Sequence, residues 1–406
     1  MLFDPLMRII IIQSIAFFDK NGDAGGGEIH LHRLASEWKK KGNEVILFTN
    51  TSDLGSKYYE DYDRIFHLRI LDTKLKNGSM TLKIYLQWLL QFRQLRSIIE
   101  GLNENTETLV IADAPTISDI ILLGFIKKRL KTIGVVYFHH IPPSPIWHPL
   151  KRGSIIATTI RWLNSQISLL LTKIFCAVPV IDHPSTLTDA GWRFSYGILN
   201  DDAFLEVYPQ DYGDKDIYSL CFISRNDVSK GVMDLLEIMS YLKELVPQVK
   251  LTIAGSIPNP SVIQNLENEI RKRGLQGCIT IKGFINRNEK EDLLKKSSIF
   301  VFPSYEEGWS LAVMEAAAYS CIPVTYDLPA YDYLGQFAVK VPVGNTEEMA
   351  RVIYKLICDQ ERRILVSKNL KDAVRKYNAK DIAMYELDYF NSLLNSYRNY
   401  HRRKDG

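Results

Sequence analysis

Charged side chains in the second half of the sequence follow short apolar segments that are typical of strands. Arg225 comes two residues after the apolar segment at residues 220–223, and Lys230 lies five residues later, immediately before Gly231 and a helical pattern. The free N–H groups at the start of a helix attract anions, and paired cations strengthen this attraction. The spacing therefore predicts a site for a diphosphate.

Two glutamates lie after a later apolar segment, in positions comparable to those of Arg225 and Lys230. Glu307 lies in the loop after the apolar segment at residues 299–302, and Glu315 lies eight residues later, within a helical pattern. A loop carboxylate can accept from sugar hydroxyls, and one about two turns deeper can accept from ribose hydroxyls. Gly308 lets the backbone approach a ligand closely. The apolar flanks of Glu315 indicate a buried neighbourhood, where we expect ligand hydroxyls to supply its partner.

These residues need a scaffold, and the sequence predicts two α/β domains. In the first half, residues 8–13 and 45–48 are short apolar strands, and between them a glycine loop precedes a helix over residues 28–41, which Gly42 ends. Strand, helix and strand in this order form a parallel βαβ unit. The pattern restarts in the second half, with strands expected at residues 220–223, 251–254, 279–281, 299–302 and 322–325. Open parallel sheets bind ligands at the carboxyl ends of their strands, where the charged residues lie.

The length of 406 residues also suits two domains better than one core. A polar, turn-rich segment at residues 200–215 predicts the connection between them. We expect an amino-terminal acceptor-side domain over residues 1–205 and a donor-binding domain over 206–378. Residues 379–406 are expected to form a helix and polar tail that cross back to the first domain.

Composition limits the classes of function. The net charge of +3, from 50 basic and 47 acidic residues, is too balanced for nucleic-acid binding by bulk charge. The five cysteines lack C-x-x-C spacing, which predicts neither a zinc site nor a redox pair and favours a reducing cytoplasmic location. The acidic residues at 61–63 and 214–216 lie in polar connections and are expected to be solvated, so we expect no metal.

Two apolar stretches are long enough to be candidates for membrane contact. Residues 132–150 contain four prolines and do not form a spanning helix. Residues 155–181 suit an amphipathic helix over a sheet or, as the alternative, one lying on a membrane surface. The basic cluster at Lys127, Lys128, Arg129 and Lys131 is a candidate for peripheral contact with anionic lipid, and a solvated helix end is the alternative.

Taken together, the ordered segments resemble glycosyltransferase family 4, a family of retaining enzymes with the GT-B fold. The resemblance rests on the E-x7-E element from Glu307 to Glu315, on Arg225 with Lys230, and on short segments across most of the chain. These segments are Gly25-Gly26-Gly27-Glu28, Ser224-Arg225, Lys230-Gly231, Ala254-Gly255, Lys282-Gly283-Phe284 and Pro303-Ser304. The resemblance implies two doubly wound, Rossmann-like parallel-sheet domains that face each other across a cleft.

The resemblance also implies a role for each site residue. Arg225 and Lys230 bind the donor diphosphate, Glu307 contacts the transferred sugar, and Glu315 holds the ribose. The remaining donor contacts fall on Gly26, Gly27, Gly283, Phe284, Ile285, Gly308, Trp309, Ser310 and Leu311. His139 resembles the acceptor-side catalytic histidine, with His140 and Asp113 nearby; a structural loop is the alternative for the two histidines.

The implied reaction moves a sugar from a nucleoside-diphosphate sugar, as co-substrate without a further cofactor, to a carbohydrate or lipid-linked acceptor. The sequence departs from the family at Ser310, where a second glycine is usual, and at Tyr319-Ser320-Cys321, which lacks the usual glycine. Two rival functions stay open: a catalytically silent GT-B scaffold or sugar-binding subunit, and a nucleotide-sugar epimerase.

Overall fold

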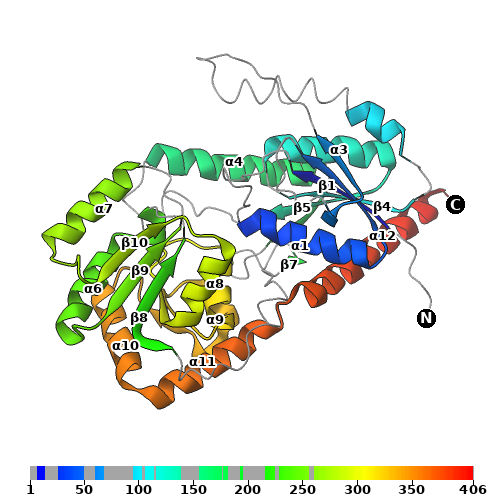
Figure 1. Ribbon diagram of the computed structural model, residues 1–406. Coiled ribbons are helices and arrows are strands. Elements are labelled where there is room, and N and C mark those ends of the chain that lie inside the picture. Colours follow the sequence, from blue (N-terminus) through cyan, green and yellow to red (C-terminus); the bar gives the residue numbers. More distant parts are fainter. Residues whose placement is uncertain are drawn as a thin grey trace. The chain divides into compact units, whose positions relative to one another are not determined.

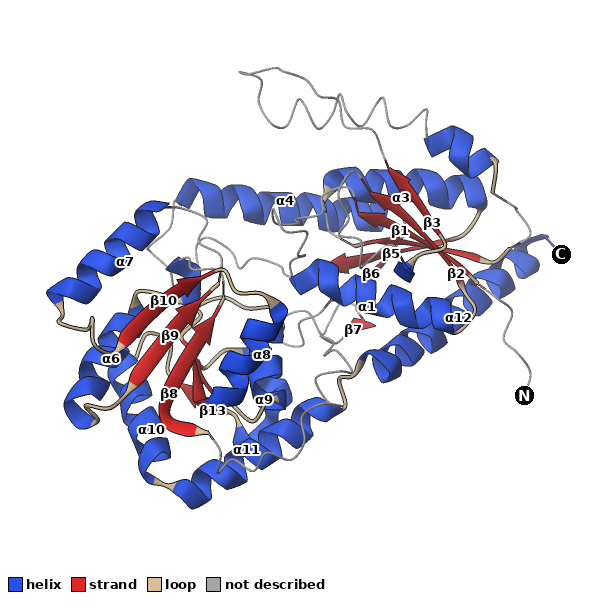
Figure 2. Cartoon of the chain, viewed as in Figure 1, coloured by secondary structure: helices blue, strands red, loops and turns tan. Residues whose placement is uncertain are grey.

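The chain folds into two compact units, each built around one parallel sheet (Figures 1 and 2). Unit 1 comprises Met1–Pro145, Ile156–Ile198 and Ala379–Gly406, and unit 2 comprises Ile146–Ile155 and Leu199–Asn378. The computed structural model describes residues 7–13, 26–49, 60–67, 95–102, 106–113, 116–138, 155–175, 177–181, 193–194, 215–224, 228–255 and 260–405.

Unit 1 contains a seven-stranded parallel sheet with strand order β3-β2-β1-β4-β5-β6-β7. Its strands are β1 Arg8–Gln13, β2 Glu44–Thr49, β3 Arg64–His67, β4 Thr108–Ala112, β5 Ile133–Phe138, β6 Val178–Ile181 and β7 Arg193–Phe194. Its helices include α1 Gly26–Lys40, α3 Ile117–Leu130, α4 Ile155–Ile174 and α12 Ala379–Asp405. The expected βαβ unit is confirmed, because β1 and β2 pair in parallel and α1 connects them in the sequence. Helix α1 begins two residues before the expected start.

The carboxy-terminal helix α12 packs on unit 1 (Figure 1). The indole of Trp38 in α1 donates to the backbone oxygen of Ala383 over 3.3 Å, and its ring meets Phe390 edge-on. The hydroxyl of Tyr137 in β5 donates to the buried carboxylate of Glu386 over 2.7 Å. Aromatic burial and two hydrogen bonds therefore attach α12 to helix α1 and strand β5.

The apolar stretch at residues 155–181 is divided between two elements, so the expectation of one amphipathic helix was wrong at its end. Helix α4 stops at Ile174, and residues 178–181 form strand β6, which pairs with β5. Pro179 cannot continue a helix, and the β-branched residues around it favour a strand. None of the described helices is long and apolar enough to cross a membrane.

Unit 2 contains a six-stranded parallel sheet with strand order β10-β9-β8-β11-β12-β13. Its strands are β8 Asp216–Ile223, β9 Lys250–Ala254, β10 Ile279–Gly283, β11 Ser297–Phe302, β12 Ile322–Tyr326 and β13 Val339–Val341. Its helices include α6 Asp234–Leu245, α7 Pro260–Lys272, α8 Arg287–Lys296, α9 Leu311–Ala318, α10 Thr346–Cys358 and α11 Gln360–Arg375, with 3-10 segments at Val228–Lys230 and Pro329–Phe337. All five strands expected from the sequence of this half are confirmed.

The acidic residues Asp63 and Asp216 are exposed, as expected, but the two polar segments also make structural contacts. Lys215 is half-buried and donates to the backbone oxygens of Leu294, Lys295 and Ser297 at the end of α8, and burial lowers its pKa. Asp63 accepts from the backbone N–H of Val45 over 2.8 Å. These contacts satisfy backbone groups at element ends, which sequence polarity alone does not reveal.

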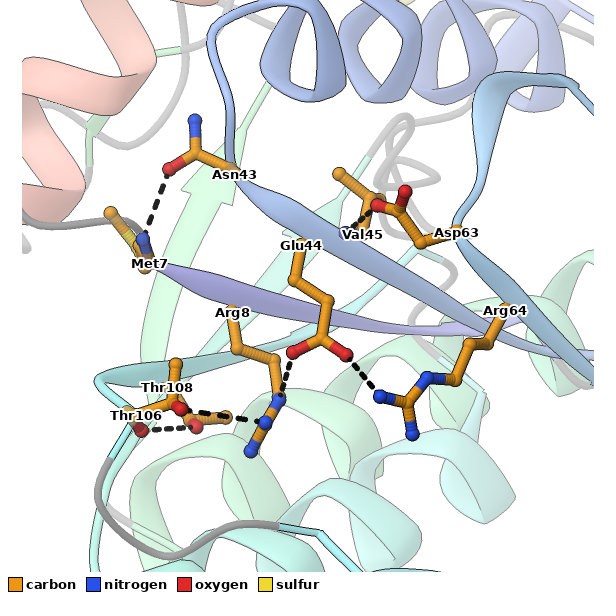
Figure 3. Close-up of polar contacts among 9 residues, drawn as sticks. All are labelled: Met7, Arg8, Asn43, Glu44, Val45, Asp63, Arg64, Thr106 and Thr108. Carbon is orange, nitrogen blue, oxygen red and sulfur yellow. Dashed lines mark hydrogen bonds and ion pairs between the residues drawn. The ribbon is translucent and has the colours of Figure 1, made fainter.

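A polar network crosses the amino-terminal edge of the first sheet (Figure 3). Glu44 accepts from Arg8 over 2.7 Å and pairs with Arg64 over 2.9 Å, which joins the starts of β1, β2 and β3. The side chain of Arg8 is only 4% exposed. Beside it, the amide oxygen of Asn43 accepts from the backbone N–H of Met7. This edge is polar but lies opposite the carboxyl ends of the strands, so we assign it a structural role.

We expect Glu44→Gln to lower the free energy of unfolding by about 2 kcal/mol, because it removes the charged partner of the buried Arg8 guanidinium. Urea unfolding followed by far-ultraviolet circular dichroism measures this loss. The control is Glu100→Gln, at an exposed pair with Arg96 where solvent screens the charges, and we expect no measurable change there. Equal effects of the two substitutions would contradict the structural role of Glu44.

Candidate functional site

A buried ion pair lies at the carboxyl end of β11. The ammonium group of Lys230 is 2.6 Å from Oε1 of Glu307, and the two side chains are 14% and 9% exposed. Lys230 also donates to the backbone oxygen of Glu306 over 3.0 Å, and the hydroxyl of Ser304 donates to Glu307 over 2.8 Å. The structure thus brings together two of the residues that the sequence singled out, and it satisfies both charges with further hydrogen bonds.

Close backbone packing holds these two segments in place. Gly231, directly after Lys230, has a φ of +70°, and a Cβ built there would lie 2.0 Å from the backbone oxygen of Pro303. Only glycine fits this approach and this left-handed conformation. The backbone N–H of Tyr305 donates to the oxygen of Ser229 over 2.9 Å. The segment before α6 is therefore fixed against the loop after β11, and α6 itself begins four residues after Lys230 rather than directly after it.

Asp234 also holds the loop after β11 in place. This buried carboxylate, in the first turn of α6, accepts from the hydroxyl of Tyr305 over 2.5 Å and from that of Tyr326 over 2.6 Å. Burial, together with the hydrogen bond to Asp234, raises the pKa of Tyr326, so its hydroxyl remains a donor. Because Tyr305 lies two residues before Glu307, we identify Asp234 as a positioning residue for the loop.

Glu315 lies in α9, as expected, but its partner comes from the chain. Its two oxygens accept from Lys290 of α8 over 2.9 and 3.0 Å, and its side chain is 16% exposed. The expectation that ligand hydroxyls alone would supply the partner was therefore wrong. An ion pair with one lysine does not by itself prevent a carboxylate from accepting a further donor.

Aromatic rings pack beside the Glu307 loop. Trp309 is buried and stacks on Tyr333 with ring centroids 4.6 Å apart, and Tyr377 meets both rings edge-on. Burial and the nearby carboxylate of Glu307 raise the pKa of Tyr331 and Tyr333, which keeps both phenols protonated. Within the described residues, neither phenol has a hydrogen-bond partner. Buried hydroxyls of this kind generally bind water or a ligand.

The two positions that depart from the family pattern both keep a glycine-like backbone. Ser310 has a φ of 56° and Ser320 a φ of 58°, each in the left-handed region. Ser310 precedes the first residue of α9, Leu311, and Ser320 follows the end of that helix. The helix that carries Glu315 is therefore bounded by two serines in a strained, left-handed conformation.

The other predicted donor residues lie at or near strand ends. Gly283 ends β10 with a φ of +70°, and its oxygen accepts from the N–H of Gly255, which follows β9. Phe284 is 44% exposed, and Ile285 is half-buried beside it. The carboxyl ends of β9 and β10 thus present an exposed aromatic ring on the same edge of the sheet as Glu307.

In unit 1, Asp113 follows β4 as expected. It is buried and accepts from the amide nitrogen of Gln13, at the end of the neighbouring β1, over 2.8 Å. Gly26 and Gly27 form the first two residues of α1. Arg225, His139 and His140 lie outside the described residues, so their roles stay predictions.

Two residues of the site were missed by the sequence analysis. Lys290 and Asp234 lie on helices whose sequences give no sign of their partners, which are 25 and 92 residues away at Glu315 and Tyr326. A lysine and an aspartate near helix ends are ordinarily solvated, so only the fold reveals these contacts. Within the part of the chain that the structure describes, no three His, Cys, Asp or Glu residues gather as a metal site would.

Residues 210–374 match the family model of the glycosyl transferases group 1. This segment contains the Lys230–Glu307 pair, Asp234, Lys290 and Glu315. The chain is 26% identical over 168 residues to the poly(glycerol-phosphate) alpha-glucosyltransferase of Bacillus subtilis (strain 168), covering 40% of this chain and 24% of that protein. It is 27% identical over 161 residues to the alpha-D-kanosaminyltransferase of Streptomyces kanamyceticus, covering 39% of this chain and 41% of that protein. The matches span less than half of either relative, and they support a glycosyltransferase.

The likeness to solved structures extends over both units. The crystal structure of Anabaena Alr3699/HepE in complex with UDP and glucose superposes with a TM-score of 0.72 at 15% identity, covering 95% of this chain and 100% of that one. At this identity the comparison shows the fold. The predicted GT-B class, with two Rossmann-like α/β units, is confirmed.

We expect Ser320→Gly to raise the free energy of unfolding by up to about 1 kcal/mol, because glycine adopts the left-handed backbone without strain. Thermal unfolding measures the change. The same substitution at Ser240, inside α6, is the matched control and should destabilise by about 0.5 kcal/mol, as glycine does in helices. A loss of stability in Ser320→Gly would contradict the assignment of strain at this turn.

Proposed function

We propose that the protein is a retaining glycosyltransferase that moves a sugar from a nucleoside-diphosphate sugar to a hydroxyl on a carbohydrate or lipid-linked acceptor. The observation that carries the proposal is the buried Lys230–Glu307 pair at the carboxyl edge of the second sheet, inside the segment that matches the glycosyl transferases group 1. The names of the two relatives, a glucosyltransferase and a kanosaminyltransferase, support transfer of a hexose-like sugar.

In this proposal, Lys230 performs two tasks. Its ammonium group holds Glu307 in place and, together with Arg225, neutralises the charge that develops on the leaving diphosphate. Glu307 then accepts from hydroxyls of the transferred sugar. The contacts of Lys230 with the backbone oxygen of Glu306 and the carboxylate of Glu307 hold its ammonium group at the carboxyl end of β11, where we propose that the donor phosphate binds.

The remaining roles follow the geometry of the two strand-end loops. Glu315, oriented by Lys290, accepts from the ribose hydroxyls, and Phe284 packs against the base. His139, His140 and Asp113 shape the acceptor side. For a lipid-linked acceptor we propose peripheral contact with the cytoplasmic face of a membrane.

The backbone at Ser310 and Ser320 favours an enzyme over a silent scaffold. The scaffold alternative depends on the two positions where the resemblance expects glycine, and the serines there adopt the left-handed conformation that glycine would supply. The sequence departures at Ser310 and Ser320 therefore give no structural support to a silent scaffold. A nucleotide-sugar epimerase would use the same diphosphate site, and analysis of the products distinguishes it from a transferase.

The two glutamates provide the sharpest test, because their proposed tasks differ. We expect Glu307→Gln to reduce sugar transfer by about two orders of magnitude while the Kd for the nucleoside diphosphate stays within about threefold. We expect Glu315→Gln to weaken nucleotide binding by at least about tenfold, the loss of a charge-assisted hydrogen bond. Calorimetric titration with the nucleoside diphosphate and a transfer assay measure the two effects.

The matched control for the two glutamates is Glu291→Gln, at a similarly buried, ion-paired glutamate of α8 whose side chain is 14% exposed. Its nucleotide affinity should equal that of the wild type. Equal loss of affinity in Glu307→Gln and Glu315→Gln, or no loss in the latter, would show that the roles are assigned wrongly. Lys230→Ala is less decisive, because it also leaves the buried Glu307 without its cation.

A further expectation concerns divalent cations. Because Arg225 and Lys230 neutralise the donor phosphates in this proposal, transfer should keep its full rate in excess chelator. The release of nucleoside diphosphate with and without the chelator measures this. A strict requirement for magnesium or manganese would mean that a metal ion, rather than these side chains, neutralises the phosphates.

A further inference from the structure

Helix α4 carries an exposed apolar stripe. Five of its large aliphatic residues are between 43% and 60% exposed: Ile160, Leu163, Ile167, Leu170 and Ile174. They recur at alternating intervals of three and four residues, so they lie along one face over a length of about 21 Å. A stripe of this length is larger than the scattered exposed apolar residues of an ordinary surface.

The opposite face of α4 packs on the core of unit 1. Ser168 and Thr172 are buried, and Leu169, Leu171 and Phe175 pack against the cluster formed by the sheet and α3. The helix is therefore held by its own unit through one face and presents the stripe on the other. The stripe is not the face by which α4 covers its sheet.

The charged residues near the carboxyl end of the stripe are mainly basic. Helix α4 contains no acidic residue, and Lys173 in its last turn is exposed. The ammonium group of Lys127, in the last turn of α3, donates to the backbone oxygen of Phe175 over 2.7 Å, so the carboxyl ends of α3 and α4 meet. Lys128 and Lys131 are exposed at that end. Arg129 is partly offset by Glu100, 3.7 Å away.

We propose that this stripe docks on an anionic lipid bilayer, with the basic residues at the ends of α3 and α4 contacting lipid headgroups. An apolar helix face flanked by basic residues is the combination that inserts into the headgroup region of a membrane. A second copy of this chain fits less well, because a seam between two α4 helices needs flanking acidic residues to pair with the basic ones. The inference deepens the membrane contact proposed above by naming the surface that makes it.

The test is co-sedimentation of the full-length protein with vesicles of phosphatidylcholine, with and without phosphatidylglycerol. We expect binding to the anionic vesicles that weakens as salt rises. The double variant Leu163→Ser/Leu170→Ser should reduce this binding at least about tenfold, because it removes two apolar anchors. The control Leu245→Ser/Leu365→Ser, at leucines 51% and 55% exposed in unit 2, should bind as the wild type does.

A second pair of double variants tests the contribution of the basic residues to membrane binding. Lys128→Gln/Arg129→Gln should weaken binding and flatten its salt dependence. Lys272→Gln/Arg273→Gln, an exposed lysine–arginine pair at the end of α7 in unit 2, should leave both unchanged. No binding of the wild type at low salt, or equal losses in a variant and its control, would overturn the proposal.

Sedimentation velocity without lipid tests the alternative that a second copy of this chain covers the stripe. Dissociation of a dimer by Leu163→Ser/Leu170→Ser, with vesicle binding unchanged, would assign the stripe to a second copy and overturn the lipid proposal. The vesicle assay contains no donor or acceptor. Failure of sugar transfer and failure of membrane docking are therefore observed separately.

Discussion

The arrangement of the second unit depends on one buried ion pair, Lys230 with Glu307. Two charges can remain buried only if they neutralise each other and their remaining hydrogen-bonding groups are satisfied. Ser304 and the backbone oxygen of Glu306 provide the additional contacts, and Gly231 permits the close backbone approach that brings the segments together. The loop after β11 is thus held in one conformation by the chain itself, which is the condition for catalysis by fixed charges.

Parallel strand order explains why the two edges of each sheet differ in use. At the amino-terminal edge of the first sheet, Glu44 joins Arg8 and Arg64 in a network that satisfies itself. At the carboxyl edge of the second sheet, Glu307 and Glu315 are also paired, each with a lysine. Ion pairs occur at both edges, so the position at the carboxyl ends of the strands, rather than pairing itself, distinguishes the candidate site from a structural contact.

Short-range pattern predicted the strands and the placement of Glu307 and Glu315, because period and turn chemistry are local properties. It did not predict the partners Lys290 and Asp234, since contacts between segments 25 or 92 residues apart depend on sheet order. The helix–strand boundary near Pro179 was missed for a related reason: both elements are apolar, and hydropathy does not separate them. The polar connection at residues 214–216 gave no sign that the ammonium group of Lys215 donates to three backbone oxygens.

Helices α1 and α4 show that apolar periodicity predicts an apolar helix face without predicting what packs on it. Both carry apolar residues at helical spacing, and in α1 the stripe is buried, with Trp38 contacting Ala383 and Phe390 of α12. In α4 the sheet-facing side is filled by Ser168, Thr172 and neighbouring residues, while the five large aliphatic residues face outward. Periodicity identifies a helix with an apolar face but not what covers that face. For α1 the cover is the carboxy-terminal helix of the same chain; for α4 the absence of acidic residues and the adjoining basic helix end favour a cover that is itself anionic.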